Sequence, residues 1–205
     1  MTNFCGVITV SCGSFSCGHI SHPYQAVIRK LEDGIQPLAD RIMTLILQLI
    51  NAAGKTSTLV EDAFLVVGAL SAALEQNFSP YINAFLPHLY PALKAHEDTQ
   101  LCKVAVGIIG DISRALGDQT AQYCSAFMSV LLENLQSDVL NRDVKISILA
   151  CFGDLAMAIG PSFEMYLQAT MGVLRQAGAL QPNPVRSTLR RSPVAHIDTS
   201  VLARH

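Results

Sequence analysis

The sequence predicts an all-α protein built as a stack of paired helices, and three observations carry this prediction. A ten-residue pattern returns three times along the chain at nearly constant spacing. Apolar residues within each pattern follow the period of an α-helix. Only 15% of the residues are charged although 50% are hydrophobic, so many side chains must face other protein, as they do in the middle of a helical repeat protein.

The recurring pattern is clearest at three glycines, which lie 42 residues apart (Gly68 to Gly110) and then 43 residues apart (Gly110 to Gly153). This is the period of HEAT and armadillo units, which are built of two or three helices. Each glycine costs about 1 kcal/mol of helix propensity relative to alanine. Their return at one register therefore predicts that the backbones of packed helices approach each other closely at these positions.

Each unit is expected to contain two helices. In the second unit, apolar residues between Leu101 and Ile112 fall at offsets 0, 3, 4, 7, 8 and 11, which is one face of a helix over three turns. Asp98 or Thr99 is expected to cap its start and Gly117 to end it. About eight helices are predicted, over residues 22–31, 37–52, around 61–70, 80–94, around 101–112, 119–136, 143–159 and 161–176. Pro87 and Pro91 should kink the fourth of these.

Charge divides the chain into three segments. Residues 1–21 contain no Asp, Glu, Lys or Arg and are expected to form an irregular extension. Residues 22–178 are the predicted solenoid; from residue 24 to 178 they hold ten Lys and Arg against fifteen Asp and Glu. Residues 179–205, with four Arg and one Asp, are predicted to be a disordered basic tail. An acidic body suits a basic protein partner and not nucleic acid.

The sequence predicts no enzyme and no cofactor. Asp111 and Asp154 occupy the same position in successive units, so they should form a ladder along one surface and not a converging site. Three cysteines, Cys102, Cys124 and Cys151, lie in apolar helical patterns, where cysteine acts as a small buried hydrophobe. No glycine-rich phosphate-binding motif is present in the sequence.

Neither a metal site nor a membrane span is expected. Cys12, Cys17, His19 and His22 are metal-ligand types, but their C-x4-C-x-H-x2-H spacing matches none of the common zinc arrangements. We therefore expect no metal, and a zinc-stabilised regulatory module stays as the alternative. The apolar stretch at residues 42–50 is too short to cross a membrane, so no membrane insertion is expected.

The repeats resemble the importin-β, or karyopherin-β, family of nuclear import receptors. The resembling segments are VAVGIIGDISRAL (104–116), LLENL (131–135), VK (144–145), FGDLA (152–156) and AIG (158–160). The likeness runs collinearly from about residue 24 to residue 178 and corresponds to the later-middle HEAT repeats of that much longer receptor. Because it includes polar positions and turns between helices, it is more specific than apolar spacing alone.

The resemblance implies how partners would be held. In this family the second helices line a concave surface that grips a basic cargo or adaptor segment, and Ran GTPase competes from the same side. Phe-Gly segments of nuclear pore proteins bind between the first helices on the convex side. The implied location is the cytoplasm, the nucleus and the nuclear envelope at the pore. Candidate contacts are Glu61, Asp62, Asp111 and Asp154 for basic partners, and Lys103, Arg114 and Lys145 for an acidic GTPase surface.

Two further functional hypotheses stay open from the sequence. One is a HEAT scaffold of another complex, such as a phosphatase or a chromosome-organising assembly. The other is a truncated product without independent function, because terminal repeats of a solenoid need polar caps and neither end of this chain supplies an obvious one. The uncapped ends lead us to expect self-association of the isolated chain.

Overall fold

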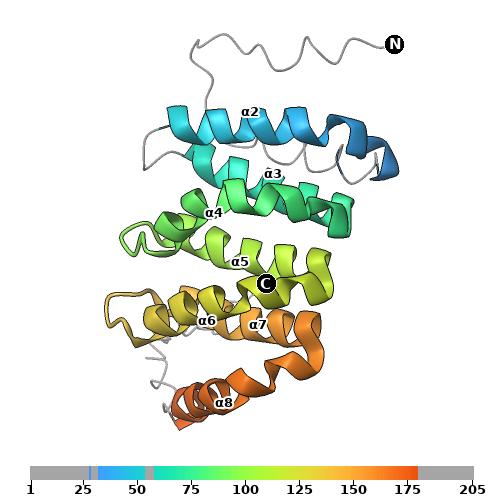
Figure 1. Ribbon diagram of the computed structural model, residues 1–205. Coiled ribbons are helices and arrows are strands. Elements are labelled where there is room, and N and C mark those ends of the chain that lie inside the picture. Colours follow the sequence, from blue (N-terminus) through green and yellow to red (C-terminus); the bar gives the residue numbers. More distant parts are fainter. Residues whose placement is uncertain (1–27, 29–31, 54–57, 180–205) are drawn as a thin grey trace, which may run out of the picture.

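The computed structural model describes Ile28, residues 32–53 and residues 58–179, and these residues form helices and turns without a strand. Figure 1 shows the helices stacked along one axis, with α2 at one end and α8 at the other. The α-helices are α2 (Ala39–Ala52), α3 (Thr58–Leu74), α4 (Ser79–Leu93), α5 (Thr99–Leu116), α6 (Ala121–Gln136), α7 (Arg142–Ile159) and α8 (Glu164–Ala179), and the 3-10 helices are η2 (Glu32–Leu38), η3 (Glu75–Phe78), η4 (Gly117–Thr120) and η5 (Gly160–Phe163).

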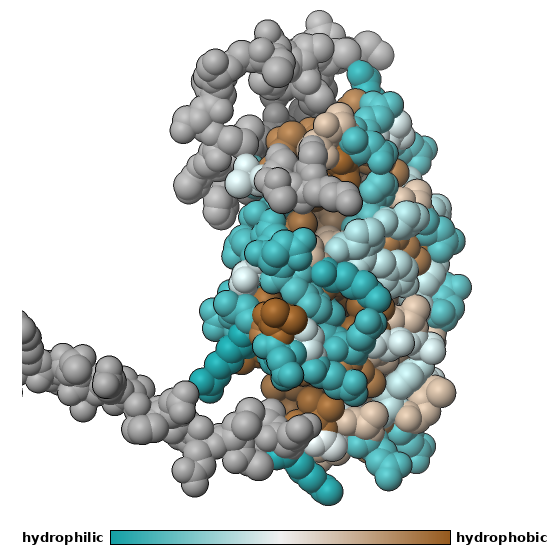
Figure 2. All heavy atoms as spheres, turned by 90° about the vertical axis from the view of Figure 1, so that its left-hand side faces the viewer, coloured by the Kyte–Doolittle hydropathy of each residue, from teal (hydrophilic) through white to brown (hydrophobic). Residues whose placement is uncertain are grey.

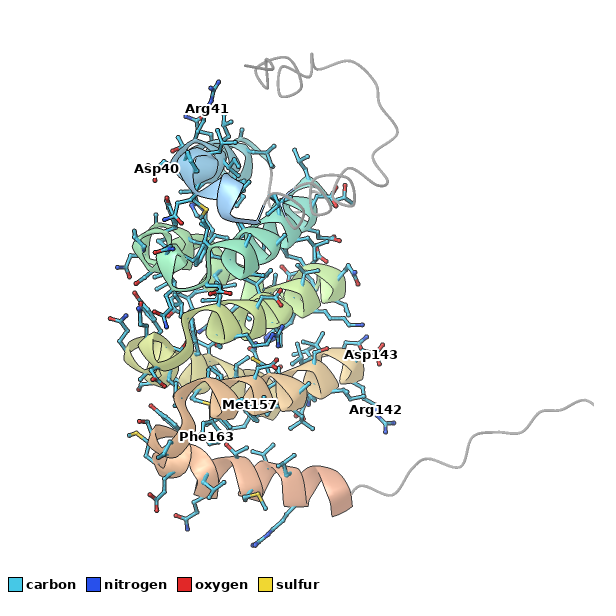
Figure 3. The ribbon with its side chains drawn as sticks, turned by 90° about the vertical axis from the view of Figure 1, so that its right-hand side faces the viewer. Asp40, Arg41, Arg142, Asp143, Met157 and Phe163 are labelled. Carbon is cyan, nitrogen blue, oxygen red and sulfur yellow. The ribbon has the colours of Figure 1, made fainter. Side chains whose placement is uncertain are left out.

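The predicted all-α solenoid is confirmed. The first helices of the repeats are α3, α5 and α7, which lie one above another in Figure 3, and α2, α4, α6 and α8 are the second helices. The predicted helix at 22–31, the extension at 1–21 with its cysteines and histidines, and the tail beyond residue 179 lie outside the described residues.

The ends of the first helices follow from local chemistry. The Asp98 side chain accepts a hydrogen bond from the backbone N–H of Leu101 at 3.0 Å, which caps α5 as expected. Asn141 caps α7 in the same way through the N–H of Asp143 at 2.8 Å. Gly117 ends α5 with a φ of 54°, a conformation that glycine adopts without steric cost.

Helix α4 continues through both of its internal prolines. Pro87 and Pro91 each lack a backbone N–H, so two carbonyl groups one turn earlier lose their helical partners. Both prolines are exposed, and water on that side of the helix can take the place of the missing donors. The helix therefore survives two residues that would end it in a core.

One hydrophobic core runs through all the described repeats. Within a unit, Phe64 of α3 meets Phe85 of α4 edge-on, with ring centroids 5.0 Å apart. Between units, the buried Asn134 of α6 donates a hydrogen bond to the carbonyl oxygen of Leu93 at the end of α4, at 2.8 Å. Packing is uneven: the first helices contact one another extensively, whereas the second helices touch their neighbours in fewer places.

One stretch of the described residues, Arg142–Arg175, is long and apolar enough to cross a membrane by length and composition. It consists of two helices, α7 and α8, which are separated by Gly160 at a φ of 52° and by Pro161. Helix α7 alone carries four charged residues, Arg142, Asp143, Lys145 and Asp154. The expectation of no membrane insertion stays a prediction.

A strained residue follows α3. Glu75 has a φ of 50°, close to the values of Gly117 and Gly160, and all three residues open the 3-10 helix that follows a first helix. The other two repeats therefore place glycine where this repeat places glutamate. A left-handed conformation costs a non-glycine residue roughly 1–2 kcal/mol.

We predict that Glu75→Gly raises the free energy of unfolding by about 1 kcal/mol, because it removes this strain at an exposed position. Urea denaturation followed by circular dichroism measures the change. Glu75→Ala is the control, since it removes the carboxylate and keeps the strain. An equal gain in both variants would assign the effect to the carboxylate and contradict the prediction.

Candidate partner-binding surface

All seven candidate contact residues lie on the first helices. They fall into two groups at different heights along these helices. The first group lies near the helix starts and comprises Glu61 and Asp62 of α3, Lys103 of α5 and Lys145 of α7. The second group lies in the later half of α5 and α7 and comprises Asp111, Arg114 and Asp154. The resemblance had implied that basic partners meet the second helices, and none of these candidates is on one.

The second group forms an ion-paired ladder between two repeats. One guanidinium nitrogen of Arg114, Nη2, lies 2.5 Å from Oδ1 of Asp111 on the same helix. The other, Nη1, lies 2.5 Å from Oδ1 of Asp154 on α7. The hydrogen bond to Asp154 is the main cause that raises the pKa of Arg114. The predicted ladder of acids is therefore present, but a cation from the same surface already occupies it.

Two glycines of the repeat make room for these acids. A Cβ added to Gly68 of α3 would lie 2.7 Å from Oδ2 of Asp111 and 2.8 Å from Cδ1 of the buried Ile108. A Cβ added to Gly110 of α5 would lie 2.5 Å from Oδ2 of Asp154. The close approach at these two positions is made by side chains of the following first helix, where the sequence had predicted an approach of the backbone. At Gly153 of α7, an added Cβ meets nothing within 4 Å among the described residues.

Substitution of the glycines tests this packing. We predict that Gly68→Ala lowers the free energy of unfolding by about 1–2 kcal/mol, because the methyl group must displace Asp111 and a core isoleucine. The matched control is Gly107→Ala on α5, where an added Cβ has open space. That variant should gain up to about 1 kcal/mol of helix propensity. Chemical denaturation measures both variants, and a stabilised Gly68→Ala protein would contradict the proposed packing.

Removal of the bridging cation should change the response to salt. In Arg114→Gln the carboxylates of Asp111 and Asp154 repel each other, and we expect a loss of about 0.5–1 kcal/mol at low salt. Raising NaCl to about 0.5 M should recover part of the loss by screening that repulsion. Lys145→Gln removes the same charge elsewhere on the first helices and is the control. Identical salt dependence in the two variants would rule out the bridge.

Acidic residues gather near the starts of α3 and α5. The pKa of Glu61 is raised, first by partial burial and then by the negative charges of Asp98 and Asp62. Asp98 was expected only as a helix cap, and its contribution to this acidic group was not visible in the sequence. We call Glu61, Asp62 and Asp98 the acidic cluster. Asp111 and Asp154 share Arg114, whereas the two aspartates of the acidic cluster act on the pKa of Glu61 by their negative charge.

The second helices carry little charge. Helix α4 contains no Asp, Glu, Lys or Arg, and its Tyr81 donates a hydrogen bond to Asp40 of α2 at 2.5 Å. Burial, followed by this bond, raises the pKa of Tyr81 to about 12. At the other end of α4, Lys94 pairs with Glu133 of α6 at 3.1 Å. These polar contacts join neighbouring repeats. The side of the stack where the loops lie is mostly hydrophilic (Figure 2).

In the described part of the chain, the candidate polar side chains lie on an open surface. A shallow polar pocket of about 410 Å³ lies where α3 and α5 end, lined by Ala72, Glu75, Gln76, Asp111, Arg114, Ala115 and Gly117. Its arginine is already held in the ladder. The thiols are buried, as predicted, and burial raises the pKa of Cys102 to about 11 and that of Cys151 to about 12. Protonated, buried thiols are poor nucleophiles.

Repeated helix pairs with a continuous core and an open polar surface define an α-solenoid of the HEAT type. Residues 19–197 match the family model of importin subunit beta-1-like TPR repeats. This match extends beyond both ends of the likeness expected from the sequence. The chain belongs to the importin subunit beta-1 family.

Individual relatives agree with the family model. Importin subunit beta-1 of Schizosaccharomyces pombe is 44% identical over 159 residues, and that of Arabidopsis thaliana is 39% identical over 163 residues. These alignments cover 78% and 76% of this chain and 18% of each relative. The chain thus spans less than a fifth of the length of the relatives it matches.

Solved structures show the same fold. A crystal structure of importin beta superimposes with a TM-score of 0.74 at 42% identity, covering 78% of this chain and 18% of that one. A complex of Kap95 with Nup1 gives 0.71 at 34% identity over 77% and 18%. A structure of Kap95p that describes its binding to RanGDP gives 0.67 at 32% identity over 78% and 18%.

Proposed function

We propose that this chain is a protein-binding section of a nuclear import receptor and that it acts without catalysis. The observation that carries the proposal is the match to the importin subunit beta-1 family over residues 19–197, together with structural likeness across 78% of the chain. The same match favours import over a phosphatase or chromosome-organising scaffold. We propose the cytoplasm, the nucleus and the nuclear pore as its locations.

The acidic cluster is the proposed contact for a basic cargo or adaptor segment. Asp111 and Asp154 share Arg114, so an incoming lysine or arginine would have to compete with a cation that is already placed. Glu61 and Asp62 have no such cation described beside them, and Asp98 adds to their negative potential. A basic side chain placed there would relieve the repulsion that raises the pKa of Glu61. Charge complementarity of this kind mainly sets specificity and association rate.

Ran and nuclear pore proteins are proposed as the other partners. The similar yeast receptor, Kap95, has been solved with Nup1, and its binding to RanGDP has been described. For this chain we propose that Lys103 and Lys145, within the first two turns of α5 and α7, contact the acidic surface of Ran. Phe-Gly segments would bind between the first helices, which pack closely against one another.

Charge reversal tests whether the acidic cluster, and not the surface as a whole, binds a basic segment. We predict that Glu61→Lys combined with Asp62→Lys weakens binding of a fluorescent lysine- and arginine-rich import-adaptor peptide by about tenfold at low salt, and less at high salt. Fluorescence anisotropy with the full chain gives the dissociation constants.

The matched control reverses Asp118 and Asp138, two exposed acids elsewhere in the stack, to lysine. This variant has the same net charge and should keep at least half of the affinity. An equal loss in both variants would show that only overall charge matters, which would remove the acidic cluster as a site. Failure of the unmodified chain to bind the peptide, Ran or a Phe-Gly peptide would sink the proposed function itself.

A further inference from the structure

The pocket between the ends of α3 and α5 joins two neighbouring repeats. It has a volume of about 410 Å³, and its polar walls are Glu75 and Gln76, which follow α3, and Asp111 and Arg114 of α5. On the α3 side it is bounded by Ala72, whose side chain is a single methyl group. The pocket therefore lies at the opposite end of the first helices from the acidic cluster, which is near the helix starts.

The next interval between repeats has a long side chain where this pocket has space. Ala72 and Arg114 occupy the same position in successive repeats, each four residues after the recurring glycine. Asp111 and Asp154 correspond in the same way, each one residue after it. Arg114 crosses from α5 to α7 and pairs with Asp154 at 2.5 Å. Between α3 and α5 the corresponding side chain is the methyl group of Ala72, which cannot reach across to Asp111.

The charges around the pocket favour a cation. Arg114 is shared between Asp111 and Asp154, so these three residues together keep one negative charge. Glu75 adds a second, and it belongs to none of the ion pairs printed for the described residues. A carboxylate has about four acceptor positions, and Arg114 pairs with Oδ1 of Asp111. Asp111 can therefore accept a second cation without releasing Arg114.

We propose that this pocket binds an arginine side chain of a partner protein, which pairs with Asp111 and Glu75 as Arg114 pairs with Asp111 and Asp154. A planar guanidinium has five N–H donors and can reach two carboxylates at once, whereas the ammonium group of lysine is a point charge. The site is separate from the acidic cluster and stands whether or not that cluster binds a basic segment.

Ligand-observed NMR with the full 205-residue chain tests the pocket. The probe is N-acetyl-arginine amide at about 1 to 10 mM, because exposed ion pairs are weak. Saturation transfer from the protein to the probe reports binding. N-acetyl-citrulline amide has nearly the same shape without the charge and should receive about fivefold less transfer. N-acetyl-lysine amide should bind about threefold more weakly than the arginine probe.

Ala72→Arg supplies the missing guanidinium from within the chain. Ala72 is exposed, so the longer side chain does not enter the core. We expect about tenfold weaker binding of the arginine probe. We also expect a urea midpoint about 0.3 M higher at low salt, because the new cation pairs with Asp111 and Glu75. The control is Ala84→Arg, at an exposed position of α4, a helix without Asp, Glu, Lys or Arg. It should leave both quantities nearly unchanged.

Variants of Glu75 separate binding from stability. Glu75→Gly relieves the left-handed backbone and should be more stable than the unmodified chain. It should nevertheless bind the arginine probe about threefold more weakly, because one of the two carboxylates is lost. Glu75→Gln keeps the strained backbone and should show the same loss of binding. Weaker binding by a stabilised variant cannot result from unfolding.

Four results would overturn the proposal. The first is equal saturation transfer to the arginine and citrulline probes, and the second is equal binding of the arginine and lysine probes. The third is unchanged probe binding in Ala72→Arg, which would place the probe elsewhere. The fourth is an equal loss in Ala72→Arg and Ala84→Arg, which would show that only overall charge matters. Probe binding that survives Glu61→Lys combined with Asp62→Lys would support a site separate from the acidic cluster.

Discussion

The position of an acid over a glycine of the preceding repeat governs how this molecule is built. Asp111 of α5 lies over Gly68 of α3, and Asp154 of α7 lies over Gly110 of α5. Without a side chain at the glycine, the carboxylate can enter the space between two first helices and still reach Arg114. Close approach of the helices and neutralisation of the acid are thus one arrangement, repeated with the period of the sequence.

The parts of the fold that depend on neighbours in sequence could be predicted. Helix periodicity, the cap at Asp98, the end of α5 at Gly117 and the burial of Cys102 and Cys151 all follow from residues within a few turns. The recurrence of the glycines also revealed close packing, because a costly residue that returns at one register needs a reason. What the sequence did not reveal is that Gly68 and Gly110 each make room for the acid of the following repeat.

The candidate site was less predictable because charge depends on what lies across the helix interface. Asp111 and Glu61 are both acids on first helices, and the sequence offered no means of telling them apart. In the fold, Asp111 is paired with a cation whereas Glu61 faces Asp98 from the next repeat. The roles of Arg114 as a bridge and of Asp98 as part of an acidic cluster depend on contacts between residues far apart in the chain. A single sequence without its fold cannot rank such acids.

The difference between the two rows of helices has a mechanical consequence. The first helices are joined by extensive contacts and by the acids that lie over the glycines of the preceding repeat. The second helices are linked by a few polar bonds, such as those of Asn134, Tyr81 and Lys94. The stack is therefore stiff along one side and compliant along the other. Bending that moves the second helices apart breaks few contacts between them. Small rotations at successive repeats add together. The row of second helices can widen or narrow as a whole while every repeat stays folded.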